Sequence, residues 1–198
     1  MKRLFNLLCI FFCLSSLTPI FSQDNSNSLD FQKRHPIYDY SDLKLKNTDT
    51  IPDFNSKDEK LKVTGTIFLS DGVTPAKDVI LFIEQPDENG NFDLREEDEK
   101  RYVHHRAWVK TDNDGKYTFY TFVPGNDRRY NQPQQIFPVI KEPTKAEYEI
   151  DTFLFEEDPL LSKRCRKKIS KKKNIARILK PKKIDGILVA ERNIVLNP

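Results

Sequence analysis

The 198-residue chain has a formal net charge of +3, although 32% of its residues are charged. So small a net charge excludes a strong overall electrostatic field, but it allows local clusters of one sign. The sequence has no Ser-His-Asp order, no glycine loop that would cradle a phosphate and no Cys-X-X-Cys pair, so it lacks the usual marks of hydrolases, nucleotide-binding proteins and dithiol enzymes.

Residues 1–22 have the pattern of a secretory signal peptide. Lys2 and Arg3 precede an apolar run of about 14 residues, and Pro19 and small side chains follow near the expected cleavage site. The run is shorter than the roughly 20 residues of a membrane-spanning helix, so we expect no membrane span. Cleavage would remove two positive charges, which lowers the net charge to +1, and would leave Cys165 without a partner for an internal disulfide. The sequence therefore predicts an exported protein, periplasmic or extracellular, whose stability comes from its core.

Residues 23–60 are predicted to form a flexible polar leader. They are rich in Asn, Ser, Asp and Lys, with isolated aromatic residues and no sustained hydrophobic period. Within the leader, residues 37–45 are the best candidates for packing against a folded domain. The sequence places the start of that domain at residue 61.

Residues 61–198 contain short runs rich in β-branched and aromatic residues, separated by turn signals such as SDG, DENGN and DNDG. No credible βαβ unit lies between the runs. The seven runs are residues 61–69, 78–85, 106–111, 116–123, 134–142, 147–156 and 186–196. Their spacing predicts an all-β fold, an antiparallel β-sandwich of about seven strands. Both faces of the run at 116–123 are partly apolar, so we expect that run to be a central strand.

A basic helix is predicted in the second half of the chain, within an insertion at residues 160–183. Asp158 is a candidate cap and Pro159 is tolerated in a first turn. Residues 163–183 contain twelve Lys or Arg and no acidic residue. These charges could form a solvated face, or they could bind an anionic surface polymer or lipid headgroups, because nearby anions reduce their mutual repulsion. We expect no specific nucleic-acid partner. The candidate contact residues are Lys163, Arg164, Arg166, Lys167, Lys168, Lys171, Lys172 and Lys173.

Two short motifs contain the residue types of metal sites. TDNDGKY at residues 111–117 begins like a calcium loop, but the distal glutamate is missing, and an Asp-Gly hairpin turn accounts for the pattern. His104 and His105 are adjacent, so in a strand their side chains would point to opposite faces and could not chelate one ion together. A surface or turn position accounts for the pair, and a place in a pocket is the alternative.

Three blocks of sequence resemble, in order and spacing, the intradiol ring-cleavage dioxygenase family. They are VTGTIFLSDGVTPAKDVILFIEQPDENGNF, RAWVKTDNDGKYTFYTFVPG and IKEPTKAEYEIDTFLFEEDPLLS, followed by RNIVL near the end. The chain is most similar to the small exported bacterial branch, which is protocatechuate dioxygenase-like, and the resemblance covers residues 61–198. It implies a β-sandwich whose loops hold a ferric ion through two tyrosinates and two histidines, so that a bound catechol becomes activated toward oxygen.

The four positions where the resemblance places iron ligands hold other residues in this chain. The two tyrosine positions are Phe92 and Asp127, and the two histidine positions are Gln135 and Phe137. Phenylalanine has no ligating oxygen, and one carboxylate does not make a tight transition-metal site. We therefore expect a protein that has lost ferric iron and catalysis, with no catalytic residue and no metal ligand at these positions.

Three functions are compatible with the sequence. One is an intradiol dioxygenase-like binding or surface-associated module without iron, and another is a polyanion-binding protein that uses the basic helix. The third is an active iron(III) dioxygenase that cleaves a catechol-like aromatic compound, with ferric iron held by displaced ligands. Those ligands would come from Tyr130, Tyr102, His104 and His105.

Overall fold

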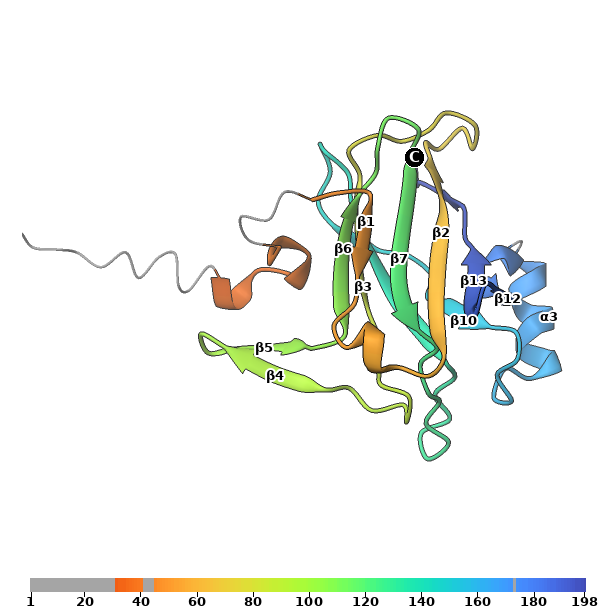
Figure 1. Ribbon diagram of the computed structural model, residues 1–198. Coiled ribbons are helices and arrows are strands. Elements are labelled where there is room, and N and C mark those ends of the chain that lie inside the picture. Colours follow the sequence, from red (N-terminus) through yellow and green to blue (C-terminus); the bar gives the residue numbers. More distant parts are fainter. Residues whose placement is uncertain (1–30, 41–44, 173) are drawn as a thin grey trace, which may run out of the picture. The chain divides into compact units, whose positions relative to one another are not determined.

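The computed structural model describes residues 31–40, 45–172 and 174–198 (Figure 1). The chain divides into two units, residues 1–34 and residues 35–198. The first contributes a helical stretch at residues 31–33 to the described part, and the second contains the strands. The predicted signal peptide, the start of the predicted leader and Lys173 lie outside the described residues. No helix in the described ranges is long and apolar enough to cross a membrane.

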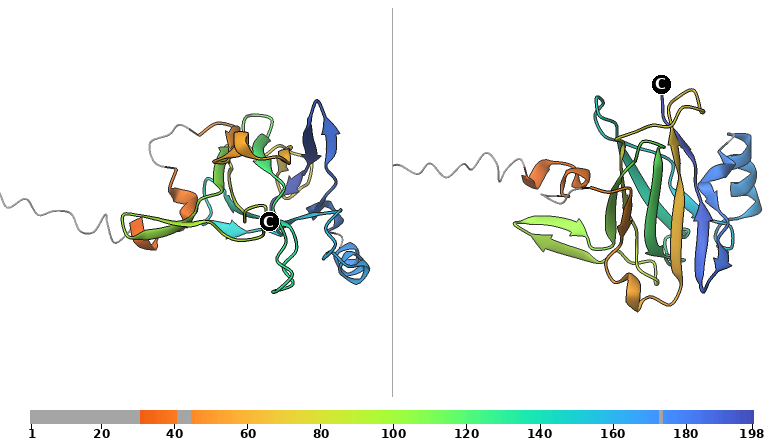
Figure 2. Two further views of the ribbon diagram at one scale, coloured as in Figure 1. Left: turned by 60° about the horizontal axis from the view of Figure 1, so that its bottom comes forward. Right: turned by 45° about the horizontal axis from the view of Figure 1, so that its top comes forward.

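One layer of the sandwich is a mixed sheet of six strands (Figures 1 and 2). The strands are β1 (Thr48–Thr50), β2 (Lys60–Phe68), β7 (Lys116–Phe122), β12 (Lys182–Ile184), β13 (Ile187–Glu191) and β14 (Ile194–Val195). Their order is β1-β7-β2-β13-β12, and β14 also pairs with β2. The long strands β2 and β7 are antiparallel, with Val63 opposite Phe119. The run at 116–123 is thus an interior strand, as expected.

The other layer is a second six-stranded sheet. Its strands are β3 (Ile80–Glu84), β6 (Arg106–Lys110), β8 (Gln135–Lys141), β9 (Tyr148–Glu149), β10 (Phe153–Phe155) and β11 (Ile178–Leu179). Their order is β11-β10-β8-β3-β6, and β9 also pairs with β8. The sequence of β3, ILFIE, is apolar at four successive positions, which is typical of a strand covered on both faces.

The main core lies between the two sheets. Inner-face side chains of both sheets form it, among them Val63, Ile67, Phe119, Ile140 and Phe153. The predicted all-β sandwich is confirmed. The structure adds detail that the pattern does not contain, because the described residues form fourteen strands, several of them only two or three residues long. Four strand pairs are parallel, so the sheets are mixed rather than purely antiparallel.

A second apolar cluster lies on the outer face of β3. Because side chains alternate along a strand, Leu81 faces the main core whereas Phe82 faces the other way. The 3-10 helix η1 (Pro36–Tyr38) covers Phe82, and its Ile37 is fully buried. Trp108 packs against the same cluster and donates its indole N–H to the carbonyl of Pro36 at 3.2 Å. These contacts anchor residues upstream of the predicted domain.

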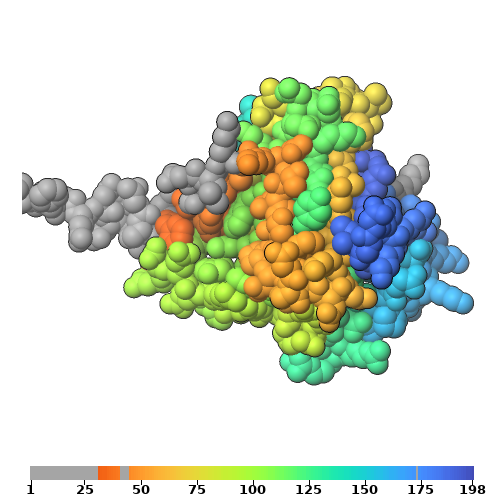
Figure 3. All heavy atoms as spheres, in the orientation of Figure 1, coloured from red at the N-terminus to blue at the C-terminus, as the bar shows by residue number. Residues whose placement is uncertain are grey.

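Residues 45–60 are also part of the folded unit. They contribute β1 and the 3-10 helix η2 (Phe54–Ser56), and β1 extends the first sheet by pairing with β7. Buried Ile51 donates its backbone N–H to the carbonyl of Tyr120 at 2.9 Å. In Figure 3 the orange atoms of this segment lie beside the green atoms of β7. The compact unit therefore begins at residue 35, ahead of the boundary expected at residue 61, because isolated apolar residues anchor a mostly polar segment.

A two-stranded ribbon, β4 (Leu94–Glu97) and β5 (Lys100–Val103), is absent from the predicted strands (Figure 1). Asp98 and Glu99 both have positive φ, as a two-residue type I′ turn requires. All four residues of β4 are exposed. The ribbon therefore lacks the apolar alternation that marks a half-buried strand in a sequence.

The predicted Asp-Gly turn joins the two sheets instead of closing a hairpin. It connects β6 to β7, which belong to different sheets. Asp112 Oδ1 accepts the backbone N–H groups of Asp114 at 3.0 Å and Lys116 at 2.9 Å. Gly115 has a φ of 66°, a conformation that glycine adopts without a steric penalty. The carboxylate thus shapes the turn.

The basic helix forms, but it is shorter than its sequence pattern. Helix α3 (Lys163–Lys171) is capped by Ser162 rather than Asp158, and the Ser162 hydroxyl accepts a first-turn N–H at 3.2 Å. After α3, the 3-10 helix η3 (Ile175–Arg177) leads into β11, which buries Ile178 and pairs in parallel with β10. Cations four residues apart repel one another along a helix, whereas sheet pairing and burial stabilise the residues that follow. The helix therefore ends early.

Candidate functional site

All four positions where the resemblance places iron ligands line one cavity of about 520 Å³. Phe92 comes from the loop before β4, and Asp127 comes from the loop after β7. Gln135 and Phe137 are two residues apart on β8, so their side chains project from one face of that strand. We call this hollow the Phe92–Phe137 cavity. The spacing of the sequence motifs thus brings the four positions together.

Close backbone packing between two loops builds one wall of the cavity. The N–H of Gly125 donates to the carbonyl of Asp87 at 2.8 Å, which joins the loop after β7 to the turn after β3. A Cβ atom on Gly125 would lie 2.3 Å from the carbonyl oxygen of Glu88 and 2.4 Å from the nitrogen of Gly90. Only a residue without Cβ permits this approach. The contact holds the loop of Phe92 next to the loop of Asp127.

Aromatic and proline side chains give the cavity apolar walls. The ring centroids of Phe92 and Phe137 are 5.7 Å apart, a separation typical of interacting aromatic pairs. Pro86 and Pro133 also contribute to the lining. Phe92 is 43% exposed and Tyr130 is 74% exposed, so the cavity opens to solvent beside these two residues.

Glu84, at the end of β3, also lines the cavity, although it was not identified as a site residue from the sequence. It pairs across the sheet with Phe137 on one side and Arg106 on the other. Burial raises the pKa of Glu84, the charge of Arg106 opposes that rise, and Glu149 adds to it. When protonated, such a carboxyl group donates a hydrogen bond as well as accepting one. The signal for it in the sequence was a charged residue that ends an apolar run.

The groups at the four positions do not fit a ferric ion. Phe92 and Phe137 offer no donor atom, and Gln135 offers a neutral amide. Asp127 is the one anionic group of the four, and it forms an ion pair with Arg129 at 3.0 Å. The hydrogen bond from Arg129 holds the pKa of Asp127 below its usual value. One carboxylate that is already paired with an arginine does not replace the two phenolates and two imidazoles that the resemblance implies.

The residues considered as displaced ligands do not gather at this cavity. Of these residues, Tyr130 lines the cavity. Tyr102 packs against Arg106, with the guanidinium carbon of Arg106 3.8 Å from the centroid of the Tyr102 ring. His104 and His105 meet Asp53 instead. Within the described part of the chain, the proposed set is therefore distributed over three places.

The two histidines lie in a bend between β5 and β6, so the argument from a strand is wrong. Their ring centroids are 5.2 Å apart, and the Nε2 atoms of His104 and His105 lie 3.0 Å and 3.6 Å from Asp53 Oδ2. Burial lowers the pKa of His105, and the nearby charges of Lys57 and His104 lower it further. Asp53 was overlooked because it belongs to the segment expected to be a flexible leader. We call these three residues the Asp53–histidine cluster.

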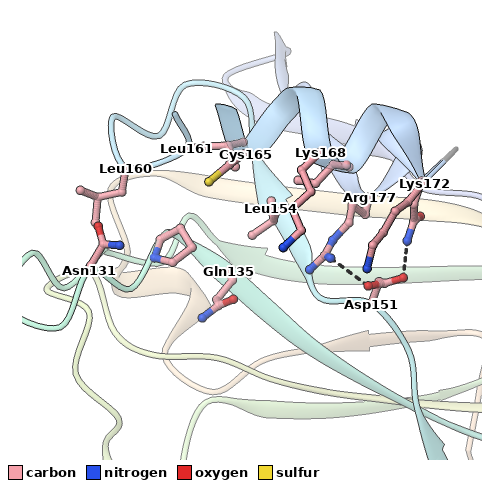
Figure 4. Close-up of a pocket in the computed structure, with 13 residues that line it drawn as sticks. Asn131, Gln135, Asp151, Leu154, Leu160, Leu161, Cys165, Lys168, Lys172 and Arg177 are labelled. Atoms are coloured by element: carbon pink, nitrogen blue, oxygen red, sulfur yellow. Dashed lines mark hydrogen bonds and ion pairs between the residues drawn. The ribbon is translucent and has the colours of Figure 1, made fainter. Parts of the chain in front are cut away.

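A groove of about 360 Å³ lies between α3 and the second sheet. Figure 4 shows the side chains of Lys168, Lys172 and Arg177 pointing into the groove, with the ends of Lys172 and Arg177 beside Asp151. Arg177 donates to Asp151 at 2.8 Å, so part of this positive charge is already paired. Gln135 lines both the groove and the Phe92–Phe137 cavity, which places the two hollows side by side.

The candidate polyanion contacts on α3 differ in their availability. Arg166 is bound internally, because its guanidinium donates to the carbonyl of Leu161 at 3.1 Å and to that of Glu156. Ile169 packs against a small apolar cluster below the helix. Four further candidates are exposed on α3 outside the groove, namely Lys163, Arg164, Lys167 and Lys171.

No protein-family model matches this chain, and no curated protein matches it. Solved structures do match. The dioxygenase domain of a dioxygenase carbohydrate-binding protein fusion from Streptomyces sp. SirexAA-E has a TM-score of 0.59 at 18% identity, covering 79% of this chain and 90% of that one. An intradiol ring-cleavage dioxygenase from Tetranychus urticae has a TM-score of 0.58 at 19% identity, covering 80% and 89%.

A larger relative in fold is hydroxyquinol 1,2-dioxygenase from Pseudomonas putida DLL-E4. Its TM-score is 0.54 at 14% identity, and the match covers 78% of this chain and 62% of that enzyme. The chain therefore has the fold of the intradiol ring-cleavage dioxygenases. The resemblance found in the sequence is confirmed at this level.

Proposed function

We propose that this chain is an exported binding protein on the intradiol dioxygenase fold, which holds a small phenolic compound without ferric iron and without cleaving its ring. The observation that carries the proposal is the Phe92–Phe137 cavity, in which two phenyl rings stand at positions expected to ligate iron. Apolar walls with a few polar groups are the usual form of a small-molecule site.

The lining of the cavity supports this ligand class. Its phenyl rings and prolines can stack against a flat aromatic ring. Glu84 and Gln135 offer hydrogen-bonding groups to phenolic hydroxyls. Solved structures with the same fold include hydroxyquinol and catechol 1,2-dioxygenases, which are named for hydroxylated aromatic rings. Replacement of iron donors by phenyl rings would keep such a pocket while removing the chemistry.

Metal analysis tests the loss of iron. Protein produced with ample iron is expected to be colourless, because a ferric tyrosinate site would colour it through ligand-to-metal charge transfer. Oxygen uptake should not rise when catechol is added. Iron at one ion per chain together with catechol-dependent oxygen uptake would overturn the proposal in favour of a dioxygenase with displaced ligands.

Calorimetric titration with catechol as the probe tests the pocket. We expect saturable binding that Phe92→Ala and Glu84→Gln each weaken by about tenfold or more, equivalent to about 1.4 kcal/mol. Leu69→Ala is the matched control, because Leu69 is 42% exposed and Phe92 is 43% exposed, but only Phe92 lines the cavity. The absence of saturable binding, or an equal loss in the control, would refute the pocket.

Placing tyrosine and histidine at the four positions tests whether these positions correspond to the iron ligands of the family. The combined variant Phe92→Tyr, Asp127→Tyr, Gln135→His and Phe137→His should take up ferric iron and become coloured. The four side chains already share one cavity, so the main chain does not have to move far to present them. A folded variant that stays iron-free would refute the correspondence between these positions and the family's iron ligands.

A second candidate function is binding of a polyanion by the outer side of α3. The supporting observation is that Lys163, Arg164, Lys167 and Lys171 are exposed, and none of these four forms an ion pair with another described residue. Neutralising all four to Gln should weaken retention on heparin and on vesicles of anionic lipid, and comparing the two matrices separates a polymer from a lipid surface. Retention that persists at high salt, or survives the substitutions, would refute electrostatic binding.

A further inference from the structure

Three potential metal ligands meet outside the Phe92–Phe137 cavity. Asp53 comes from the segment between β1 and β2, and His104 and His105 come from the bend between β5 and β6. The donor atoms of the three side chains all lie within 4.8 Å of one another. The chain has three histidines, and two of them are in this cluster. The fold thus assembles two imidazoles and one carboxylate from segments about fifty residues apart in sequence.

His105 provides independent support for a ligand. Its side chain is 3% exposed, and neither of its ring nitrogens has a hydrogen-bond partner among the described residues. Its Nε2 faces Asp53 Oδ2 at 3.6 Å, too far for a hydrogen bond. Buried polar atoms without a partner are rare, and an ion or a water is a common explanation for those that occur. A cation between His105 and Asp53 would satisfy the exposed edge of the carboxylate and the buried imidazole at once.

The spacing suits a small transition-metal ion. Two ligand atoms about 2.05 Å from a tetrahedral zinc ion lie about 3.4 Å from each other. The two distances from Asp53 Oδ2 lie on either side of this value: 3.0 Å to His104 Nε2, which is a hydrogen bond that a bound ion would replace, and 3.6 Å to His105 Nε2. Small rotations of the exposed Asp53 side chain would equalise them. The pair of imidazoles disfavours calcium and magnesium, which prefer oxygen ligands throughout.

Other charged groups near the cluster are balanced. Two cations lie near it: the ammonium group of Lys57 pairs with Glu88 at 2.8 Å, and the guanidinium group of Arg95 pairs with Asp93 at 2.9 Å. The carbonyl of Asp93 accepts the backbone N–H of His104 at 2.8 Å, which fixes the bend. Because the two ion pairs each sum to zero charge, the Asp53 carboxylate is left as the net charge of the group, which favours a cation.

We propose that Asp53, His104 and His105 form a binding site for one divalent transition-metal ion, with zinc as the best-fitting probe. Three protein ligands leave a fourth tetrahedral position, which opens to solvent because the Asp53 side chain is 48% exposed. The site is independent of the phenolic cavity and uses none of its lining residues.

Zinc titration of the purified, EDTA-treated protein tests the site. We expect one zinc ion per chain by calorimetry, and a rise in melting temperature as zinc is added. Asp53→Asn and His104→Gln should each weaken binding by about tenfold or more. His35→Asn is the matched control, because it removes the third histidine and keeps a good helix cap at η1. The control should bind zinc as the unchanged protein does.

Imidazole nitrogen NMR spectra of the unchanged protein give a second readout that does not depend on a variant folding. Zinc should shift the ring signals of His104 and His105 and leave those of His35 in place. A shift confined to His35, the absence of saturable zinc binding, or zinc affinity that survives both Asp53→Asn and His104→Gln would overturn the site. The cavity variant Phe92→Ala should bind zinc at this cluster unchanged, and Asp53→Asn should bind catechol unchanged, which separates failure here from failure of the phenolic pocket.

Discussion

Replacing Ile37 by alanine tests whether the segment before residue 61 belongs to the folded domain. Ile37 is 0% exposed and packs with Phe82 and Val139 on the outer face of the second sheet. The substitution removes three carbon atoms, which costs about 2.4 kcal/mol at about 0.8 kcal/mol each. A residual cavity adds to this cost, so the free energy of unfolding should fall by about 3–4 kcal/mol. For a unit of this size, the expected loss in melting temperature is about 6–16 °C.

Thermal denaturation and tryptophan fluorescence together measure this effect. The chain has one tryptophan, and Trp108 donates its indole N–H to Pro36 while its ring centroid lies 5.2 Å from that of Phe82. Undocking of η1 should therefore expose Trp108 and shift its emission to longer wavelength below the melting temperature. The control Ile175→Ala removes the same atoms from a side chain that is 49% exposed and should change stability by less than about 0.5 kcal/mol. Equal melting temperatures for the two variants would refute the docking of η1.

Three further substitutions test individual contacts. Gly125→Ala forces a Cβ against the carbonyl of Glu88 and should cost about 1–3 kcal/mol in urea unfolding and weaken catechol binding; unchanged binding would contradict the role of this contact in the cavity wall. Tyr117→Phe removes a hydroxyl that donates to the Arg192 carbonyl at 2.5 Å and should cost about 1–2 kcal/mol, whereas a neutral change would mean that the bond is not formed in solution. Burial raises the pKa of Glu84, so its contribution to stability is present at low pH and is lost as pH rises through its folded-state pKa. The stability of Glu84→Gln relative to the unchanged protein should therefore increase as pH rises above the usual pKa of a glutamate. A relative stability that falls over this range would refute the raised pKa.

The sandwich was predictable because the alternation of apolar and polar residues within each long strand can be seen in the sequence of that strand alone. In β2 and β7 the buried residues alternate with less buried ones, and the period of two is visible in the sequence. Short edge strands such as β1 and β14 have too few residues to show a period. The anchoring of η1 depends on the outward-facing Phe82, and a continuous apolar run in β3 indicates burial on both faces without identifying the covering segment.

The cavity was partly predictable for a different reason. The positions of Phe92, Asp127 and Gln135 follow from their sequence separation from the turn motifs. Gly125 packs closely against the turn after β3, and this contact brings positions that are separated in sequence to one cavity. Glu84 was missed because its role depends on burial beside Phe137 across the sheet.

The Asp53–histidine cluster was not predictable by the same route. The adjacency of His104 and His105 excludes chelation only if both residues are in a regular strand. A bend after β5 removes that condition, and the sequence there carries no glycine or proline to signal it. The third member, Asp53, is about fifty residues away in a segment with weak structural signals. Only the tertiary fold brings the carboxylate to the imidazoles.

Replacement of iron donors is compatible with a stable fold because the donors lie outside the main core. Gln135 and Phe137 are on the part of β8 that borders the cavity, whereas Ile136 and Ile140 of the same strand belong to the buried cluster between the sheets. In small zinc domains metal binding supplies the folding free energy, so loss of ligands unfolds the chain. Here the two packed sheets supply the apolar burial, and the pairing of phenyl rings at 5.7 Å adds an aromatic contact beside them. Phenyl rings at these positions therefore favour the folded state, in agreement with the iron-free binding protein that we propose.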